Sequence, residues 1–168
     1  MTSFNKKIIF IMGVSGCGKS SVGQLLADEL STVFIDADDH HLPANIEKMS
    51  QGTPLTDEDR APWLDKINQI ATEHLTTGAV IACSGLKETY RKRLVKSIEK
   101  HAVWVYLKGD YDLIYRRMKD RKGHFMGAAM LKSQFDTLQE PSDAVVVDIA
   151  NSLERVIRDI VLGLAYTE

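Results

Sequence analysis

A glycine-rich segment near the start of the chain carries the strongest chemical signal. Gly13-Val-Ser-Gly-Cys-Gly-Lys-Ser20 has the spacing G-x-x-x-x-G-K-S. Its glycines let the backbone curl so that several N–H groups converge on phosphate oxygens at the positive end of a helix. In this pattern Lys19 reaches the β- and γ-phosphates of a nucleotide, and the Ser20 hydroxyl ligates Mg²⁺. The residues predicted to bind the nucleotide are Gly13, Val14, Ser15, Gly16, Cys17, Gly18, Lys19 and Ser20.

The kind of nucleotide follows from motifs elsewhere in the chain. Regulatory GTPases usually carry an Asn-Lys-x-Asp tetrapeptide that reads guanine, and the sequence contains none. Asp120-Arg-Lys-Gly123 matches a switch-type D-x-x-G, but a glycine that stops a helix explains it as well. We therefore expect ATP as the phosphoryl donor, together with Mg²⁺.

A cluster of aspartates and histidines follows a short apolar run. In Asp36-Ala-Asp-Asp-His-His41 the first and third residues are two apart, so in extended chain they point the same way. Such carboxylates accept hydrogen bonds from substrate hydroxyls, and one can act as the base on the attacking oxygen. We assign that role to Asp38, expect Asp36 to support Mg²⁺ through water, and expect His41 to bind substrate. The alternative is a polar loop in which an aspartate caps a helix.

The charges around this cluster discriminate between acceptors. Three carboxylates repel a nucleoside monophosphate unless arginines intervene, whereas a polyhydroxylated substrate is not repelled. Cationic side chains follow at Arg60, Lys87 and Arg91, and the last two lie four residues apart on one face of a predicted helix. They are candidates for binding a substrate carboxylate, against the alternative of a solvated basic face. Hydroxyls together with a carboxylate indicate a sugar acid.

A second basic segment lies further on. Arg116-Arg-Met-Lys-Asp-Arg-Lys122 leads into Gly-His-Phe. Charge that builds on a transferred phosphoryl group has to be met by cations, and arginines at a closing lid supply them only in the closed state. Arg117 and Arg121 share a helical face and are the candidates for this ATP-binding role, and Arg121 joins Lys19 and Asp38 as a catalytic residue. Basic residues that favour the dipole at a helix C-terminus are the alternative.

An alternation of strands and helices places these residues. Apolar runs rich in valine and isoleucine, without in/out alternation, predict strands buried on both faces at 8–12, 33–35, 79–83, 103–107 and 144–149. Stretches of helical period predict helices at 19–30, 57–75, 87–100, 111–121 and 153–164. Such alternation predicts an α/β fold with a parallel sheet and right-handed crossovers. Thr56 with Asp59 gives a capping signal, and Gly78 follows the end of that helix.

Two connections exceed the usual length. They span 36–56 and 122–141, and long inserts in a compact domain are usually lids or binding loops. Open α/β sheets bind ligands beyond the carboxyl ends of their strands, and the first insert leaves such an end. We therefore expect 36–56 to bind substrate and 122–141 to be a mobile lid.

Composition narrows the class of partner. The chain of 168 residues fits one domain, 1–168, and its net charge of −2 gives no global attraction to nucleic acid or to an anionic membrane. Only five apolar residues, Ile8–Met12, precede the first glycine, which is too few for a signal peptide or a membrane helix. We expect a cytoplasmic protein with small-molecule partners. Cys17 and Cys83 lack metal-ligand spacing and are expected to be small buried thiols.

Several further motifs, taken with the phosphate loop, are those of a known family. They include Asp36-x-Asp-Asp-x-His41, Asn45-Ile-Glu-Lys-Met49, Pro54-Leu-Thr-Asp-Glu-Asp-Arg60, Pro62-Trp-Leu, Cys83-Ser-Gly-Leu-Lys87, Tyr90-Arg91, Lys122-Gly-His-Phe and Ser133-Gln-Phe. With these the chain resembles the bacterial gluconate kinase family, within the nucleoside-monophosphate-kinase-like P-loop kinases, over nearly its whole length. The phosphate loop is common to many kinases, but the later segments together are specific.

The resemblance implies transfer of the γ-phosphate of ATP to the 6-hydroxyl of D-gluconate. It also implies a three-layer sandwich with a five-stranded parallel sheet, a mobile lid and often a homodimer. The chain departs from the family pattern at Gly85, where alanine or serine is usual, at Ala37, where glycine is usual, and at Leu42 before Pro43. The alternatives are a shikimate or nucleoside monophosphate kinase of the same fold, and, from another class, a nucleotide-driven switch or a nucleic-acid-binding ATPase. The missing guanine motif and the near-neutral charge weigh against the last two.

Overall fold

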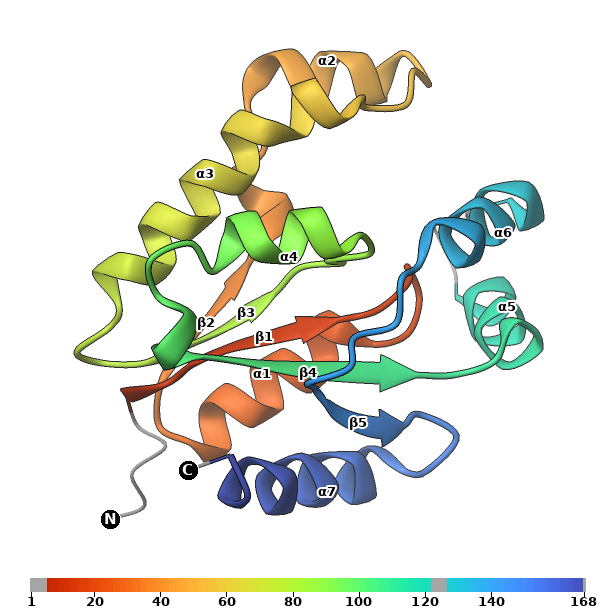
Figure 1. Cartoon of the computed structure of the whole chain (residues 1–168). Coiled ribbons are helices and arrows are strands. Elements are labelled where there is room, and N and C mark those ends of the chain that lie inside the picture. Colours follow the sequence, from red (N-terminus) through yellow and green to blue (C-terminus); the bar gives the residue numbers. More distant parts are fainter. Residues whose placement is uncertain (1–5, 122–126, 168) are drawn as a thin grey trace.

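Five parallel strands form one sheet at the centre of the molecule. The computed structural model describes residues 6–121 and 127–167, and Figure 1 shows their arrangement. The strand order is β2-β3-β1-β4-β5, and each neighbouring pair is parallel. The strands are β1 (Ile8–Met12), β2 (Val33–Asp36), β3 (Ala79–Ala82), β4 (Ala102–Lys108) and β5 (Val145–Asp148). The parallel α/β sheet predicted from the sequence is confirmed, and each strand lies within one residue of its expected bounds.

Helices cover both faces of the sheet, as parallel sheets require (Figure 1). The α-helices are α1 (Lys19–Glu29), α2 (Pro43–Ser50), α3 (Asp57–Glu73), α4 (Glu88–Leu94), α5 (Tyr111–Asp120), α6 (Ala128–Thr137) and α7 (Leu153–Ala165). The 3₁₀ helices η2 (Ala37–His40) and η3 (Glu99–His101) are short. The helices expected around 19–30, 57–75, 111–121 and 153–164 are therefore present as α1, α3, α5 and α7.

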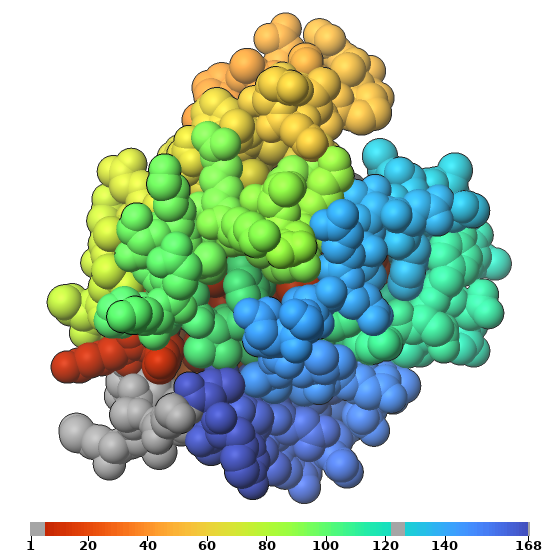
Figure 2. All heavy atoms as spheres, in the orientation of Figure 1, coloured from red at the N-terminus to blue at the C-terminus, as the bar shows by residue number. Residues whose placement is uncertain are grey.

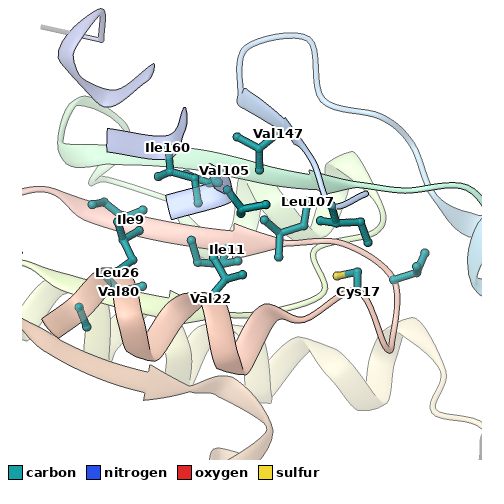
Figure 3. Close-up of a cluster of buried hydrophobic side chains, with 14 of the residues drawn as sticks. Ile9, Ile11, Cys17, Val22, Leu26, Val80, Val105, Leu107, Val147 and Ile160 are labelled. Atoms are coloured by element: carbon teal, nitrogen blue, oxygen red, sulfur yellow. The ribbon is translucent and has the colours of Figure 1, made fainter. Parts of the chain in front are cut away.

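The residues of β1 alternate between two hydrophobic clusters. Ile9 and Ile11 belong to the cluster that α1 and α7 complete, drawn in Figure 3. Ile8, Phe10 and Met12 belong to the cluster on the other face, which α3 and α4 complete. All five side chains are at most 1% exposed. The middle strand is therefore fixed from both sides, and the loop that follows it starts from a rigid position.

Helix α4 is shorter than the sequence predicted. The expected helix at 87–100 ends at Leu94, with Lys87 as its N-cap residue. The Asn68 side chain donates to the Leu94 carbonyl at 2.8 Å and to the Lys96 carbonyl at 3.0 Å. Ser97 then takes a positive φ of 67°, which a helix does not allow. A side chain from α3 thus satisfies the carbonyls at the end of α4, and the prediction of a longer helix was wrong.

Helices α2 and α6 lie within the two long connections, where the sequence predicted no helix. Helix α2 and the start of α3 form one arm that projects from the sheet, and α5 and α6 form a second arm on another side (Figure 1). Figure 2 shows a notch in the surface between α2 and α6. No helix within residues 6–121 and 127–167 is long and apolar enough to cross a membrane.

Candidate functional site

The phosphate loop joins β1 to α1 and takes the backbone shape that its glycines allow. Gly18 is the N-cap residue of α1, with a left-handed φ of 99°. Gly16 has a φ of 80°, and a Cβ there would collide with the Met118 side chain of α5. The Lys19 ammonium lies over the loop and donates to the carbonyls of Gly13 at 3.0 Å and Val14 at 3.1 Å. The loop thus presents the N-terminus of α1 and one ammonium to the same space.

This space is a cavity at the carboxyl ends of β1, β2 and β3. Eight of its lining residues are predicted site residues, namely Ser15, Gly16, Gly18, Lys19, Ser20, Asp36, Asp38 and Arg121. The remaining lining residues are Ser21, Ala82, Cys83 and Ser84. Parallel strands place all their carboxyl ends at one edge, so loops far apart in sequence meet here.

Ser20 and Asp36 form a direct pair within the cavity. The Ser20 hydroxyl donates to the Asp36 carboxylate at 2.9 Å. The other carboxylate oxygen of Asp36 accepts from the backbone N–H of Asp38 at 3.0 Å and so caps η2. The capping alternative considered for this loop is therefore true of Asp36. Mg²⁺ prefers oxygen donors, and a hydroxyl with a carboxylate beside a phosphate loop fits that ion.

Asp38 projects from η2 with its side chain 79% exposed. The Nε2 atom of His41 lies 3.5 Å from the Asp38 carboxylate. A hydrogen bond from His41 is the main reason that the pKa of Asp38 is below its ordinary value. Asp38 is therefore ionised at neutral pH and can accept a proton from a hydroxyl.

His41 is held by its ring rather than by further polar contacts. Its side chain is 10% exposed and stacks on Trp63, with 4.2 Å between ring centroids. Among the described residues its Nδ1 atom, which is buried, has no hydrogen-bond partner. The Trp63 indole N–H donates to the Ala37 carbonyl at 2.8 Å, so α3 positions η2 through this side chain. The substrate-binding role predicted for His41 stays a prediction.

Lys87 and Arg60 meet around an aromatic ring and a carboxylate. The Lys87 ammonium lies 3.2 Å from both oxygens of Asp57, and the Tyr90 hydroxyl donates to the same carboxylate. The hydrogen bonds from Tyr90 and Lys87 lower the pKa of Asp57, and the Asp57 contact raises that of Lys87. Arg60 lies over the Tyr90 ring at 5.5 Å and donates to the Leu55 carbonyl at 2.6 Å. Lys87 and Arg60, two of the three cations predicted to bind a substrate carboxylate, are thus neighbours.

Arg91 has a different environment from Lys87. It is 7% exposed, and its guanidinium donates to the carbonyls of Gly85 at 2.7 Å and Leu86 at 3.3 Å. Gly85 takes a left-handed φ of 54°, and a Cβ there would lie 3.2 Å from the Trp104 ring. Arg91 therefore supports the loop between β3 and α4, and its predicted contact with substrate stays a prediction.

The two candidate arginines of α5 are placed differently. Arg121 is the C-cap residue of α5 and lines the cavity. Arg117 lies one turn earlier, is exposed, and is not among the cavity-lining residues. Residues 122–126 of the expected lid lie outside the described residues.

The sequence analysis missed a contact between α6 and the phosphate loop. The Gln134 side-chain oxygen accepts from the Ser15 backbone N–H at 2.7 Å, and its amide donates to the Ser15 hydroxyl at 3.1 Å. The signal available was the motif Ser133-Gln-Phe, which carried the resemblance but not a role. Both cysteines are buried, as predicted, and burial raises their pKa, that of Cys83 to about 12.

Comparison with known proteins shows to which family this chain is similar. The shikimate kinase family model matches residues 15–161. The thermoresistant gluconokinase of Escherichia coli (strain K12) is 46% identical over 162 residues, which cover 93% of this chain and 92% of the relative. The thermosensitive gluconokinase of the same organism is also 46% identical, over 87% of this chain and 81% of the relative.

Solved structures agree with the sequence relatives. A gluconokinase from Sinorhizobium meliloti 1021 superposes with a TM-score of 0.88 at 41% identity, covering 96% of this chain and 93% of that one. A shikimate kinase from Aquifex aeolicus superposes with a TM-score of 0.64 at 20% identity, which shows a shared fold. Similarity in sequence and structure is therefore greater to gluconokinases than to shikimate kinases in these comparisons.

Proposed function

The chain belongs to the gluconokinase family of P-loop kinases, and on that basis we propose that it moves the γ-phosphoryl group of MgATP to the 6-hydroxyl of D-gluconate, giving 6-phosphogluconate. The observation that carries this function is the 46% identity to a curated gluconokinase over more than nine-tenths of both chains. The cavity supports it, because a phosphate loop and an ionised aspartate face each other there. The protein is an ATP-dependent kinase, and the position of transfer is the finer proposal.

On the nucleotide side, backbone N–H groups of the phosphate loop bind phosphate oxygens at the start of α1. Lys19 exchanges its two carbonyl acceptors for the β- and γ-phosphates, since charge-assisted hydrogen bonds are stronger than neutral ones. Ser20 and Asp36 would hold Mg²⁺, Asp36 through water. When bound, the ion neutralises charge on the phosphates.

On the acceptor side, Asp38 orients the 6-hydroxyl and takes its proton. As the hydroxyl oxygen bonds to the γ-phosphorus, the bond from that phosphorus to the bridging oxygen of ADP breaks. The hydroxyl proton passes to the Asp38 carboxylate, which His41 keeps ionised beforehand. Arg121, from the other side of the cavity, offsets the charge on the transferred group.

The acceptor carboxylate is assigned to the cations around Tyr90. Lys87 and Arg60 both lie within 6 Å of that ring, and both approach Asp57. A sugar acid bound there extends its hydroxyl chain toward Asp38. The mobile lid, the homodimer and the cytoplasmic location expected from the sequence stay predictions, as does the absence of nucleic-acid and membrane partners.

Shikimate is the second candidate acceptor, because the matching family model is that of shikimate kinase. A panel of D-gluconate, glucose, shikimate and AMP at equal concentration with MgATP, read as kcat/KM, separates the candidates. Gluconate should lead, since glucose lacks the carboxylate and cannot form the charged hydrogen bond with Lys87, a difference of about 1.5–3 kcal/mol. AMP brings a phosphate toward Asp36 and Asp38, where repulsion opposes binding. A higher kcat/KM for shikimate or AMP than for gluconate would overturn the acceptor and leave only the kinase.

Lys87→Ala locates the carboxylate within this panel. The variant should lose most of the preference for gluconate over glucose. Its affinity for a non-hydrolysable ATP analogue should stay unchanged, because Lys87 lies outside the phosphate loop. An unchanged preference would move the carboxylate away from Lys87.

A further inference from the structure

Residues 134–140, here called the strap, touch both sides of the site. The strap begins in α6, passes beside the loop that follows β1, and leads toward β5 (Figure 1). It contributes two glutamines, Gln134 and Gln139, to which the catalytic scheme above gives no role. Each makes a two-point hydrogen bond to a different loop.

Gln134 binds the nucleotide side. Its oxygen accepts from the Ser15 N–H at 2.7 Å, and its amide donates to the Ser15 hydroxyl at 3.1 Å. A backbone N–H can only donate, so the amide orientation is fixed by chemistry. Ser15 is among the residues that line the cavity where phosphate is expected. The phosphate loop is thus tied to a side chain 119 residues away.

Gln139 binds the acceptor side. Its backbone N–H donates to the Leu86 carbonyl at 2.8 Å, and its side-chain oxygen accepts from the Glu88 N–H at 2.7 Å. Glu88 is the first residue of α4, and the N-cap residue Lys87 provides no side-chain cap of its own. Gln139 therefore caps α4 from another part of the chain and fixes the start of this helix, where Lys87, one of the two cations assigned to the acceptor carboxylate, is the N-cap residue.

Leu138, between the two glutamines, and Glu140, directly after the second, hold the strap against the sheet. Leu138 packs against both hydrophobic clusters of the sheet. The Tyr106 hydroxyl donates to Glu140 at 3.1 Å, and the Lys108 ammonium pairs with Glu140 at 3.0 Å. Both partners belong to β4, so the strap has little freedom to slide along the edge of the sheet.

We propose that the strap sets the distance between the phosphate loop and the start of α4, with Gln134 and Gln139 as positioning residues for phosphoryl transfer. The inference rests on the proposed function, since it needs the donor on one loop and the acceptor on the other. Neither glutamine touches the reacting atoms. A misplacement of about 1 Å between reacting groups costs about 100-fold in rate, so a device that fixes this distance acts on kcat.

The test is a matched pair at one position. Gln139→Met keeps the length of the side chain but removes the acceptor, whereas Gln139→Glu keeps an acceptor for the Glu88 N–H. With MgATP and D-gluconate, Gln139→Met should lose about 10- to 100-fold in kcat, and Gln139→Glu should recover most of it. The dissociation constant of a non-hydrolysable ATP analogue should stay within roughly threefold in both. Gln69→Met is the control, because Gln69 is an exposed residue of α3 that donates to Glu73.

A double variant tests whether the two glutamines act through one strap. If they do, Gln134→Met with Gln139→Met should cost about as much as the worse single change, since residues that act as a unit are non-additive. Rates are read well below each variant's unfolding temperature, which separates positioning from stability. Losses that multiply, or a Gln139→Met enzyme with wild-type kcat, overturn the strap. A wild-type protein that does not phosphorylate gluconate overturns the proposed function instead, and the two failures are therefore distinguishable.

Discussion

The hydrogen-bond acceptors of Lys19 are expected to change when ATP binds. In the structure its ammonium donates to two neutral carbonyls of the phosphate loop. Phosphate oxygens carry charge and form hydrogen bonds roughly twice as strong, so we expect the side chain to move to them when nucleotide binds. The carbonyl contacts keep Lys19 folded over the loop beforehand, which reduces the ordering cost of binding.

Lys19→Ala should therefore keep the fold but lose about 10²- to 10³-fold in kcat, because a charge on the transferred phosphoryl group disappears. Turnover and circular dichroism of the purified variant check both parts. Lys66→Ala, at an exposed position of α3, is the control and should keep wild-type turnover. Near-normal turnover in a folded Lys19→Ala enzyme would falsify the phosphate-loop assignment.

The variant Asp38→Asn removes the basicity of this side chain but keeps its shape. The amide keeps the size of the side chain and its reach toward the acceptor but cannot take a proton, so kcat should fall strongly while ATP affinity stays within a few-fold. Steady-state kinetics with a parallel nucleotide titration give both values. If nucleotide binding collapsed instead, Asp38 would act on the metal or on the fold.

Residues local to a motif could be predicted, and pairs distant in sequence could not. Lys19, Ser20 and Asp36 follow from spacing and strand ends, and the cavity brings them together. The buried position of Arg91 was not predictable, because its carbonyl partners depend on how the loop after β3 closes. The contact of Gln134 with Ser15 spans 119 residues, and no local pattern encodes such a pairing.

At the scale of elements, helix α3 begins with the capping signal read from the sequence. The Thr56 side chain accepts from the Asp59 N–H, and the Asp59 side chain accepts from the Thr56 N–H. Asp59 also pairs with Lys48 of α2 at 2.7 Å, so one carboxylate joins the cap to the neighbouring helix. These contacts lower the pKa of Asp59 from 3.8 to about 2, and the hydrogen bond from Lys48 is the largest cause.

The lowered pKa of Asp59 gives a pH-dependent contribution to stability. A carboxylate with a depressed pKa stabilises the fold above its unfolded value, near 3.8, and loses that effect as the pH falls through about 2. Asp59→Asn should therefore lower the free energy of unfolding at pH 6 and have progressively less effect between pH 4 and pH 2. Urea unfolding of both proteins across this range measures the difference. Lys48→Met should show the same pH dependence, and a constant difference at all pH values would contradict the linkage.

The helices that the sequence missed have weak signals for physical reasons. Helix α2 buries only Asn45, so it lacks an apolar stripe, and its Ile46 and Met49 are exposed. Helix α6 buries only Leu131 among ten residues. Amphipathic period is the main sequence signal for a helix, and helices that lie on arms outside the core do not need it.

At the scale of the whole molecule, the strand order determines which loops lie on each side of the phosphate loop. Because β1 lies between β3 and β4, the loops after β2 and β3 meet the phosphate loop on one side, and the α5 and α6 arm meets it on the other (Figure 1). Asp36 and Ser84 thus come from the acceptor side, and Arg121 and Gln134 come from the opposite arm. The sequence predicted the parallel sheet from alternation alone, whereas this partition required the strand order.

Nucleotide binding should stabilise this whole assembly, since a ligand that binds only the folded state shifts unfolding by mass action. At 100 times its dissociation constant, a non-hydrolysable MgATP analogue adds about 2.7 kcal/mol. For a chain of this size that corresponds to a rise of about 5–10 °C in Tm, at about 2–4 °C per kcal/mol. Removing Mg²⁺ with EDTA should reduce the rise, and Ser20→Ala should make it insensitive to EDTA, because the Ser20–Asp36 pair is the proposed metal contact. Scanning calorimetry with ATP and GTP analogues, each with and without Mg²⁺, checks these outcomes. An EDTA-insensitive rise in the wild type would remove the metal role of this pair, and an equal rise with the GTP analogue would contradict the preference for ATP.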